Sequence, residues 1–222
     1  MTDFQIRMYR DEDQEAAMET FTVAMSEHVP AAFLHMLRQP LTQGALACVF
    51  LTVLAVTGSL LPPVLTLALA LAACRWFVGH LFSRYIDVCR RGDLGCIREV
   101  YMERADACFW VAESRGRVVG TVACLPSRQR PGSLELKRMS VQRNHRGRGV
   151  ARELCRTVVE FARGRGYREV LLYTSVVQAD ARRLYERAGY RRAGEAVVPE
   201  IPAKLMNFTL IEYRYQLPDG DG

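Results

Sequence analysis

Two glycines alternate with arginines where the chain reads Arg146-Gly147-Arg148-Gly149, between an apolar strand pattern and a helical pattern. A glycine loop at a helix start lets backbone N–H groups close around an anion, and the helix dipole adds positive charge. Arginine side chains in such a loop donate charge-assisted hydrogen bonds to phosphate. The loop lacks the Lys-Ser/Thr pair of a P-loop and the GxGxxG spacing of a dinucleotide site. We therefore predict that it binds a pyrophosphate.

The segments on either side of this loop must position it. Residues 133–141 alternate apolar and polar side chains, which predicts a strand, and a phase slip near Lys137 and Arg138 predicts a β-bulge. Residues 146–163 carry an apolar stripe at helical spacing. The whole chain is expected to run strand, helix, apolar insert, short helix capped by Asp93, three strands, helix, strand, helix and two strands. This order predicts an α/β fold with a mixed central sheet flanked by helices.

A second motif follows the loop at a distance of about thirty residues. The stretch "QADARRLYERAGY" begins at Gln178 and includes Tyr185. Together with "RGRGVA", in this order of strands and helices, it resembles the GNAT superfamily of acetyl-CoA-dependent N-acetyltransferases. The superfamily's first motif is Arg/Gln-x-x-Gly-x-Gly/Ala, and its second matches at Ala181, Leu184, Tyr185, Gly189 and Tyr190, with Gln178 in place of the usual asparagine.

The resemblance implies direct attack by a neutral amine on the acetyl thioester, with CoA as the leaving group and no metal. Tyr185 would be the general acid for the departing thiolate, and Glu135 the general base, directly or through a water molecule. The implied binding residues for acetyl-CoA are Met139, Ser140 and Val141 for the pantetheine arm, Arg146, Gly147, Arg148, Gly149, Val150 and Ala151 for the pyrophosphate, and Gln178.

Simpler interpretations of the same residues stay open. Tyr185 can be a half-buried core aromatic on a helix, and Glu135 a solvent-facing carboxylate beside Lys137. The glycines can mark a plain turn at a helix start. His145 lies in the loop, which favours anion binding over a role as the base. Lys137, Arg138 and Arg128 are expected to be surface charges, although they could hold a substrate carboxylate.

No charged residue occurs from Leu41 to Cys74. A membrane-crossing helix needs about 20 apolar residues, so this run exceeds one crossing. Pro62 and Pro63 divide it, which predicts a turn between two arms of a membrane hairpin. A single tilted helix kinked at Pro62, or a hairpin buried in a soluble core, are the alternatives. Arginines flank both sides of the run, and this pattern favours two cytoplasmic ends.

An insert of this kind after the first helix resembles the camello-like group of the superfamily, the group of N-acetyltransferase 8, whose members reside in the endoplasmic reticulum membrane. The resemblance implies a small-molecule amine as acceptor, above all the amino group of cysteine S-conjugates, with protein lysine as the alternative. A catalytically silent acyl-CoA-binding membrane protein is a further alternative. The expected division is residues 1–38 for the first strand and helix, 39–83 for the membrane hairpin, 84–217 for the remainder and 218–222 for a flexible tail.

Composition narrows the classes of partner. The net charge is +6, and all but two of the 30 basic residues are arginines, interleaved with 24 acidic residues. This spread disfavours nucleic-acid binding, which needs a concentrated basic surface. The seven cysteines form no CxxC pair, so neither a zinc site nor a disulfide framework is expected. The oligomeric state is left open.

Overall fold

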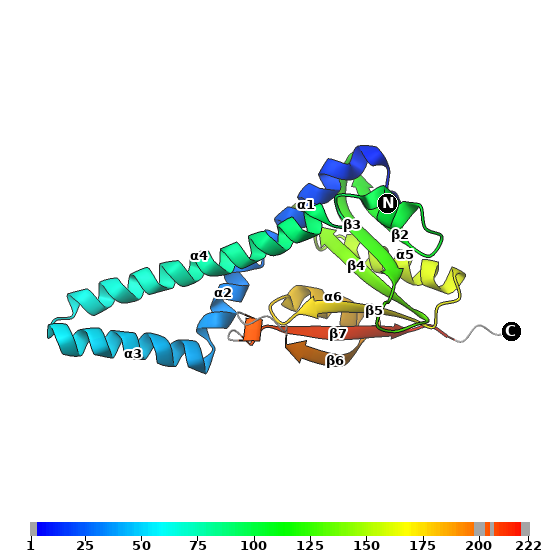
Figure 1. Ribbon diagram of the computed structural model, residues 1–222. Coiled ribbons are helices and arrows are strands. Elements are labelled where there is room, and N and C mark those ends of the chain that lie inside the picture. Colours follow the sequence, from blue (N-terminus) through cyan, green and yellow to red (C-terminus); the bar gives the residue numbers. More distant parts are fainter. Residues whose placement is uncertain (1–3, 198–202, 205–206, 219–222) are drawn as a thin grey trace.

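The computed structural model describes residues 4–197, 203–204 and 207–218, and this part of the chain forms one twisted sheet with helices on both faces (Figure 1). The sheet order is β1-β2-β3-β4-β5-β7-β6, and β4 and β5 are parallel while the other neighbours are antiparallel. The strands are β1 (Gln5–Met8), β2 (Cys108–Ser114), β3 (Arg117–Pro126), β4 (Ser133–Val141), β5 (Glu169–Ser175), β6 (Arg191–Val197) and β7 (Thr209–Gln216). The predicted mixed α/β fold is therefore confirmed.

The helices are α1 (Gln14–Ser26), α2 (Val29–Leu37), α3 (Pro40–Thr57), α4 (Leu61–Arg91), α5 (Val150–Gly164) and α6 (Ala179–Arg187). The region of the expected short helix is a single π-helical turn, Arg98–Met102. The helix predicted to begin at Arg146 begins at Val150 instead, because Gly147 and Gly149 take left-handed φ angles of 77° and 87°. A right-handed helix cannot continue through such residues.

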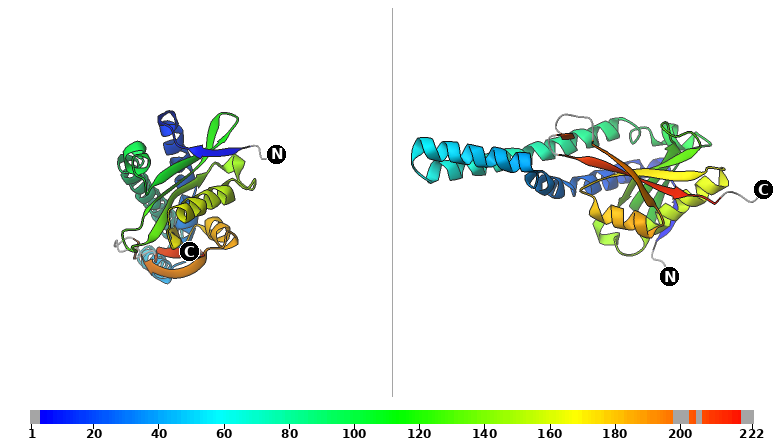
Figure 2. Two further views of the ribbon diagram at one scale, coloured as in Figure 1. Left: turned by 90° about the vertical axis from the view of Figure 1, so that its right-hand side faces the viewer. Right: turned by 90° about the horizontal axis from the view of Figure 1, so that it is seen from below.

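Helices lie on both faces of the sheet (Figure 2), and a cluster of apolar side chains fills the space between the sheet and the helices on each face. On one face, α5 and the Tyr185 end of α6 pack on residues such as Trp110, Leu136 and Leu172. On the other face, α1 and the last turns of α4 pack on Phe109 and Val111. Strands β2, β3 and β5 are buried on both faces, which explains their near-continuous apolar sequences, whereas β4 alternates apolar and polar residues as predicted.

The apolar insert forms an antiparallel hairpin of α3 and α4 that projects from one end of the domain (Figure 1). The turn lies at Gly58, with a φ of 63°, and not at the prolines. Pro62 and Pro63 stand in the first turn of α4, where a missing N–H costs no helix hydrogen bond. The prediction of a hairpin is confirmed, and the placement of its turn at Pro62 and Pro63 was wrong.

Helix α4 is continuous across the boundary expected between residues 83 and 84. Its first half presents exposed apolar side chains, whereas Val78, Ile86 and Cys89 are buried against the domain. One helix therefore belongs to both the hairpin and the catalytic core. The tail expected at 218–222 lies, beyond Pro218, outside the described residues.

Candidate active site

Strands β4 and β5 part in the middle of the sheet. Their parallel pairing runs from Ser133 opposite Glu169 to Leu136 opposite Leu172, and within the described sheet it ends there. The side chains of Ser140 and Val141 are buried in the two faces of the sheet, and that of Met139 is partly buried. What β4 offers toward β5 beyond Leu136 is therefore backbone N–H and C=O groups, which suit an extended ligand that carries amides.

The parting of the strands coincides with the predicted β-bulge in β4. The register against β3 shifts between Thr121 and Ala123, and opposite this shift Arg138 has a φ of 55°. A non-glycine residue in this left-handed region is strained by roughly 1–2 kcal/mol. The hydroxyl of Thr121 donates to the carbonyl of Arg138 at 2.9 Å, which helps to hold the bulge.

The side chain of Arg138 anchors this bulge and is not a surface charge. Its guanidinium donates to both carboxylate oxygens of Asp93 at 2.6 and 2.8 Å, and it lies over the ring of Phe21. A third nitrogen lies 3.0 Å from the Sγ of Cys89 on α4. Tyr101 donates to the same Asp93 carboxylate. Asp93 therefore does not cap a helix as expected, and sequence reasoning missed this network because its members are far apart in the chain.

The glycine loop connects the end of β4 to the first turn of α5. No side chain caps that turn, so its N–H groups remain oriented toward the loop. A Cβ on Gly149 would meet only Arg152 at 4.0 Å, so the glycine serves the left-handed conformation and not a crowded position. The arrangement is a helix N-terminus with a backbone loop, and it can bind a pyrophosphate.

Arg146 is held in the loop by two contacts. Its Nε donates to the carbonyl of Val141 at 3.0 Å, and its Nη1 pairs at 2.7 Å with Glu27, the residue that directly follows α1. Burial lowers the pKa of the adjacent His28, and the positive charge of Arg146 lowers it further. A phosphate entering the loop would compete with Glu27 for Arg146. Sequence reasoning missed Glu27 and His28.

Gln178 precedes α6 and closes the turn after β5. Its side-chain carbonyl accepts from the backbone N–H of Ser175 at 2.9 Å and from the hydroxyls of Thr174 and Ser175 at 3.1 and 3.0 Å. This is a structural position that an asparagine or glutamine carbonyl fills well. The expected contact of Gln178 with acetyl-CoA remains a prediction that the geometry does not strengthen.

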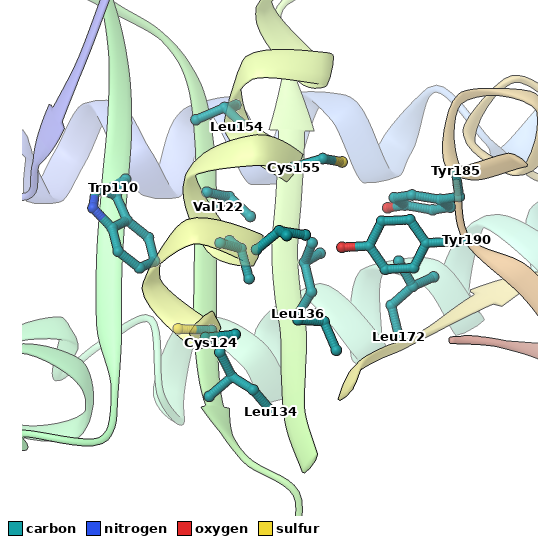
Figure 3. Packing of buried hydrophobic residues seen from close by; sticks show 14 of the residues in the cluster. Trp110, Val122, Cys124, Leu134, Leu136, Leu154, Cys155, Leu172, Tyr185 and Tyr190 are labelled. Carbon is teal, nitrogen blue, oxygen red and sulfur yellow. The ribbon is translucent and has the colours of Figure 1, made fainter. Parts of the chain in front are cut away.

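Tyr185 lies on α6, against the rings of Tyr190 and Tyr213 at centroid distances of 5.8 and 6.2 Å. It is 5 % exposed, and burial raises its pKa well above the usual range. In Figure 3 its hydroxyl points toward the side where Cys155 and Leu136 lie. Leu136 is the last residue of β4 that pairs with β5, so the phenol is directed toward the point where the strands part.

Glu135 lies on the opposite face of the sheet from Tyr185. Its neighbours Leu134 and Leu136 belong to the same apolar cluster as Tyr185, and successive strand residues point to opposite faces. The carboxylate pairs with Lys137 at 3.4 Å and its side chain is 22 % exposed. The structure brings Glu135 to Lys137 and not to Tyr185, so the two predicted catalytic groups flank the parting strands from opposite sides.

The described residues hold no group of three His, Cys, Asp or Glu side chains that is arranged to bind a metal ion. The candidate site combines the backbone amides of β4, the glycine loop with Arg146, the buried phenol of Tyr185 and the carboxylate of Glu135. These are the parts needed to bind a phosphorylated, amide-containing cofactor and to transfer protons beside it.

Comparisons with known proteins identify the family of this chain. The model of the "Acetyltransferase (GNAT) family" matches residues 71–190. N-acetyltransferase 8 of Rattus norvegicus is 37 % identical over 98 % of this chain and 99 % of its own length. N-acetyltransferase 8B of Homo sapiens is 36 % identical over 98 % and 97 %. Among solved structures, a GNAT-family acetyltransferase from Staphylococcus aureus Mu50 superimposes with a TM-score of 0.60 at 16 % identity, over 97 % of this chain and 99 % of that one, which shows the shared fold. The chain therefore belongs to the GNAT family and, within it, to the N-acetyltransferase 8 group, and it is an N-acetyltransferase that uses acetyl-CoA.

Proposed function

We propose that this acetyltransferase is anchored in the endoplasmic reticulum membrane and acetylates the amino group of cysteine S-conjugates. The observation that carries the site assignment is the parting of β4 and β5 after Leu136, directly beside the glycine loop. Acetyl-CoA would lie in this opening with its pyrophosphate on the loop from Arg146 to Ala151. Its pantetheine amides would pair with the backbone of Met139 to Val141.

In the proposed reaction the neutral amine of the acceptor attacks the thioester carbonyl and the carbon–sulfur bond breaks. Tyr185, a phenol that is protonated at neutral pH, donates its proton to the departing CoA thiolate. Glu135, on the opposite face of the sheet, first takes a proton from the ammonium group of the acceptor through a water molecule, which gives the neutral amine. The second nitrogen proton, lost as the amide forms, goes to solvent, from which Tyr185 regains its proton. The amide product and free CoA then leave.

Membrane anchoring is supported by the character of the hairpin. Helices α3 and α4 are both long and apolar enough to cross a bilayer, and no side chain of α3 is buried in the protein. The 18 residues of α3 span about 27 Å, close to the roughly 30 Å hydrocarbon core. Because the hairpin returns to the side it left, and arginines flank both of its ends, we infer that the catalytic domain lies on the cytoplasmic face.

Topology can be tested directly with glycosylation acceptor sites in intact microsomes. An acceptor sequence placed in the Arg128–Gly132 loop of the catalytic domain should remain unmodified, and one placed at Gly58–Leu60 should be modified if that turn reaches the lumen. Modification of the catalytic-domain site would contradict the cytoplasmic assignment.

The acceptor can be identified by measuring CoA release from acetyl-CoA with detergent-purified protein and S-benzylcysteine, aspartate or a lysine peptide. We expect turnover with S-benzylcysteine, and a decrease in kcat of about 100-fold in Tyr185→Phe, a typical contribution of general acid catalysis. Tyr167→Phe is the matched control, since its hydroxyl contacts the carbonyl of Asp106 away from the parting strands. Turnover with the lysine peptide alone would refute the proposed substrate and indicate a protein acetyltransferase.

A further inference from the structure

The hydroxyl of Tyr190 is buried without a hydrogen-bond partner among the described residues. Tyr190 is 2 % exposed and follows Gly189, whose φ of 93° turns the chain from α6 into β6. Its own backbone N–H is satisfied by the carbonyl of Tyr185 at 3.0 Å. The unpaired group is therefore the phenol alone.

A buried hydroxyl that has no hydrogen-bond partner lowers the stability of the folded protein. Transferring a hydroxyl from water to an apolar interior without a hydrogen bond is unfavourable, whereas a phenylalanine fills the same volume without that penalty. Buried polar side chains in native proteins nearly always have partners, and exceptions point to a ligand or a water molecule. The position of Tyr190 thus calls for an acceptor that the described residues do not provide.

The surroundings of Tyr190 indicate where this acceptor would lie. Its ring meets the ring of Tyr185 edge to face at 5.8 Å and that of Tyr215 at 5.4 Å. In Figure 3 the hydroxyls of Tyr185 and Tyr190 point to the same side, toward Cys155 of α5 and Leu136 of β4. Leu136 is the last residue of β4 that pairs with β5, so both phenols are directed toward the place where these strands separate.

We propose that Tyr190 is a second hydrogen-bond donor to the thioester group of bound acetyl-CoA, beside Tyr185. The proposal rests on the placement of acetyl-CoA between β4 and β5 under Proposed function. Tyr190 keeps its proton throughout: it binds the thioester in the ground state and the developing thiolate more strongly in the transition state, while Tyr185 transfers its proton to sulfur. Charge-assisted hydrogen bonds are stronger than neutral ones, so the contact favours the transition state.

Burial supports the assignment of Tyr190 as a donor that does not ionise. It raises the pKa of Tyr190 well above the usual value, and the neighbouring thiol of Cys155 and phenol of Tyr185 raise it further.

The test compares Tyr190→Phe with the unchanged protein in three measurements: binding of acetyl-CoA, binding of 3′,5′-ADP, and melting temperature without ligand. The nucleotide covers only the phosphate end of the cofactor, so it does not reach Tyr190. We expect the Kd for acetyl-CoA to rise about threefold to tenfold, as for a lost hydrogen bond, with the Kd for 3′,5′-ADP unchanged. The melting temperature should be unchanged or higher, and kcat should fall about tenfold. Tyr215→Phe is the control, since it keeps the ring that packs on Tyr190.

Unchanged affinity for acetyl-CoA together with unchanged kcat in Tyr190→Phe would overturn the proposal. A lower melting temperature with equal loss of affinity for both ligands would also overturn it, because Tyr190 would then serve packing alone. Failure of the proposed substrate is distinguishable: if the unchanged protein released no CoA with any of the three acceptors, the two binding measurements would still decide the role of Tyr190.

Discussion

The ion pair between Arg138 and Asp93 is expected to contribute more to stability than any exposed pair in the molecule. The two side chains are only 11 % and 19 % exposed, and they share two hydrogen bonds. Removing one partner of a buried pair leaves an uncompensated charge and typically costs about 3–5 kcal/mol. We therefore expect Asp93→Leu to lower the free energy of unfolding by about 3 kcal/mol or more.

In a chain of this size, 1 kcal/mol corresponds to about 2–4 °C in melting temperature, so the expected decrease is about 6–12 °C. The assay is thermal unfolding of the detergent-purified protein followed by circular dichroism. The double variant Asp93→Leu with Arg138→Met removes both charges and should be less destabilised than Asp93→Leu alone. Asp11→Asn, in the exposed pair with Arg98, should change the melting temperature little.

Two results would refute this reasoning. The first is a loss of stability in the double variant that equals the sum of the losses in the single variants Asp93→Leu and Arg138→Met, which would show that the two side chains are not coupled. A melting temperature of Asp93→Leu within the range of the exposed control would show that the buried pair contributes nothing.

The same pair predicts a pH dependence. Burial alone would raise the pKa of Asp93, but the hydrogen bonds and charge of Arg138, followed by the hydroxyl of Tyr101, outweigh burial and lower it. A carboxyl group with a lowered pKa in the folded state stabilises the fold above its unfolded pKa, about 3.9, and this stabilisation is lost as the pH falls through the folded value. The melting temperature of Asp93→Leu should therefore depend less on pH below about 4 than that of the unchanged protein.

Three further predictions concern the loop, the turn before α6 and the start of the β4–β5 pairing at Glu169. Gly149→Ala forces a side chain into a φ of 87°, which should cost about 1 kcal/mol and raise the Kd for 3′,5′-ADP, measured by calorimetry. Gln178→Ala removes the acceptor for the N–H of Ser175 and should lower the free energy of unfolding by about 1–2 kcal/mol, measured by denaturant titration, with little change in cofactor affinity if its role is structural. Burial would raise the pKa of Glu169, but hydrogen bonds from Ser133 and Arg130 help to lower it. The ionised carboxylate therefore stabilises the fold, and this stabilisation is lost as the pH falls below about 4.5. In Glu169→Gln the melting temperature should depend less on pH in this range, measured as melting temperature against pH.

Local patterns in the sequence predict the order of elements, the bulge near Arg138 and the hairpin. These features depend on residues adjacent in the chain: alternation for strands, periodicity for helices, and a long uncharged run for the insert. The turn of the hairpin was misplaced because proline is compatible with both a break and a first helical turn, and Gly58 gave the turn instead.

The part of the site that sequence reasoning missed consists of contacts between distant segments. Asp93 and Arg138 are 45 residues apart in the sequence, and Arg146 pairs with Glu27, which precedes it by more than 100 residues. The local sequence around a charged residue does not identify the distant residue that will form an ion pair with it. Tyr190 was identified only as part of a motif, because its missing partner becomes visible only when all its neighbours are in place.

Because α4 is continuous, a tilt of its membrane part would also displace its other end, which packs beside the candidate active site, if the hairpin is anchored as proposed. A helix of 31 residues is about 46 Å long, so a change in tilt of about 5° displaces one end by about 4 Å relative to the other. Bilayers thinner or thicker than the hairpin are accommodated in part by such tilting. Cys89, near the C-terminal end of α4, contacts the guanidinium of Arg138, which anchors the bulge in β4. Turnover in reconstituted vesicles is therefore expected to vary with the acyl-chain length of the host lipid, as it would in an enzyme that senses the thickness of its own membrane.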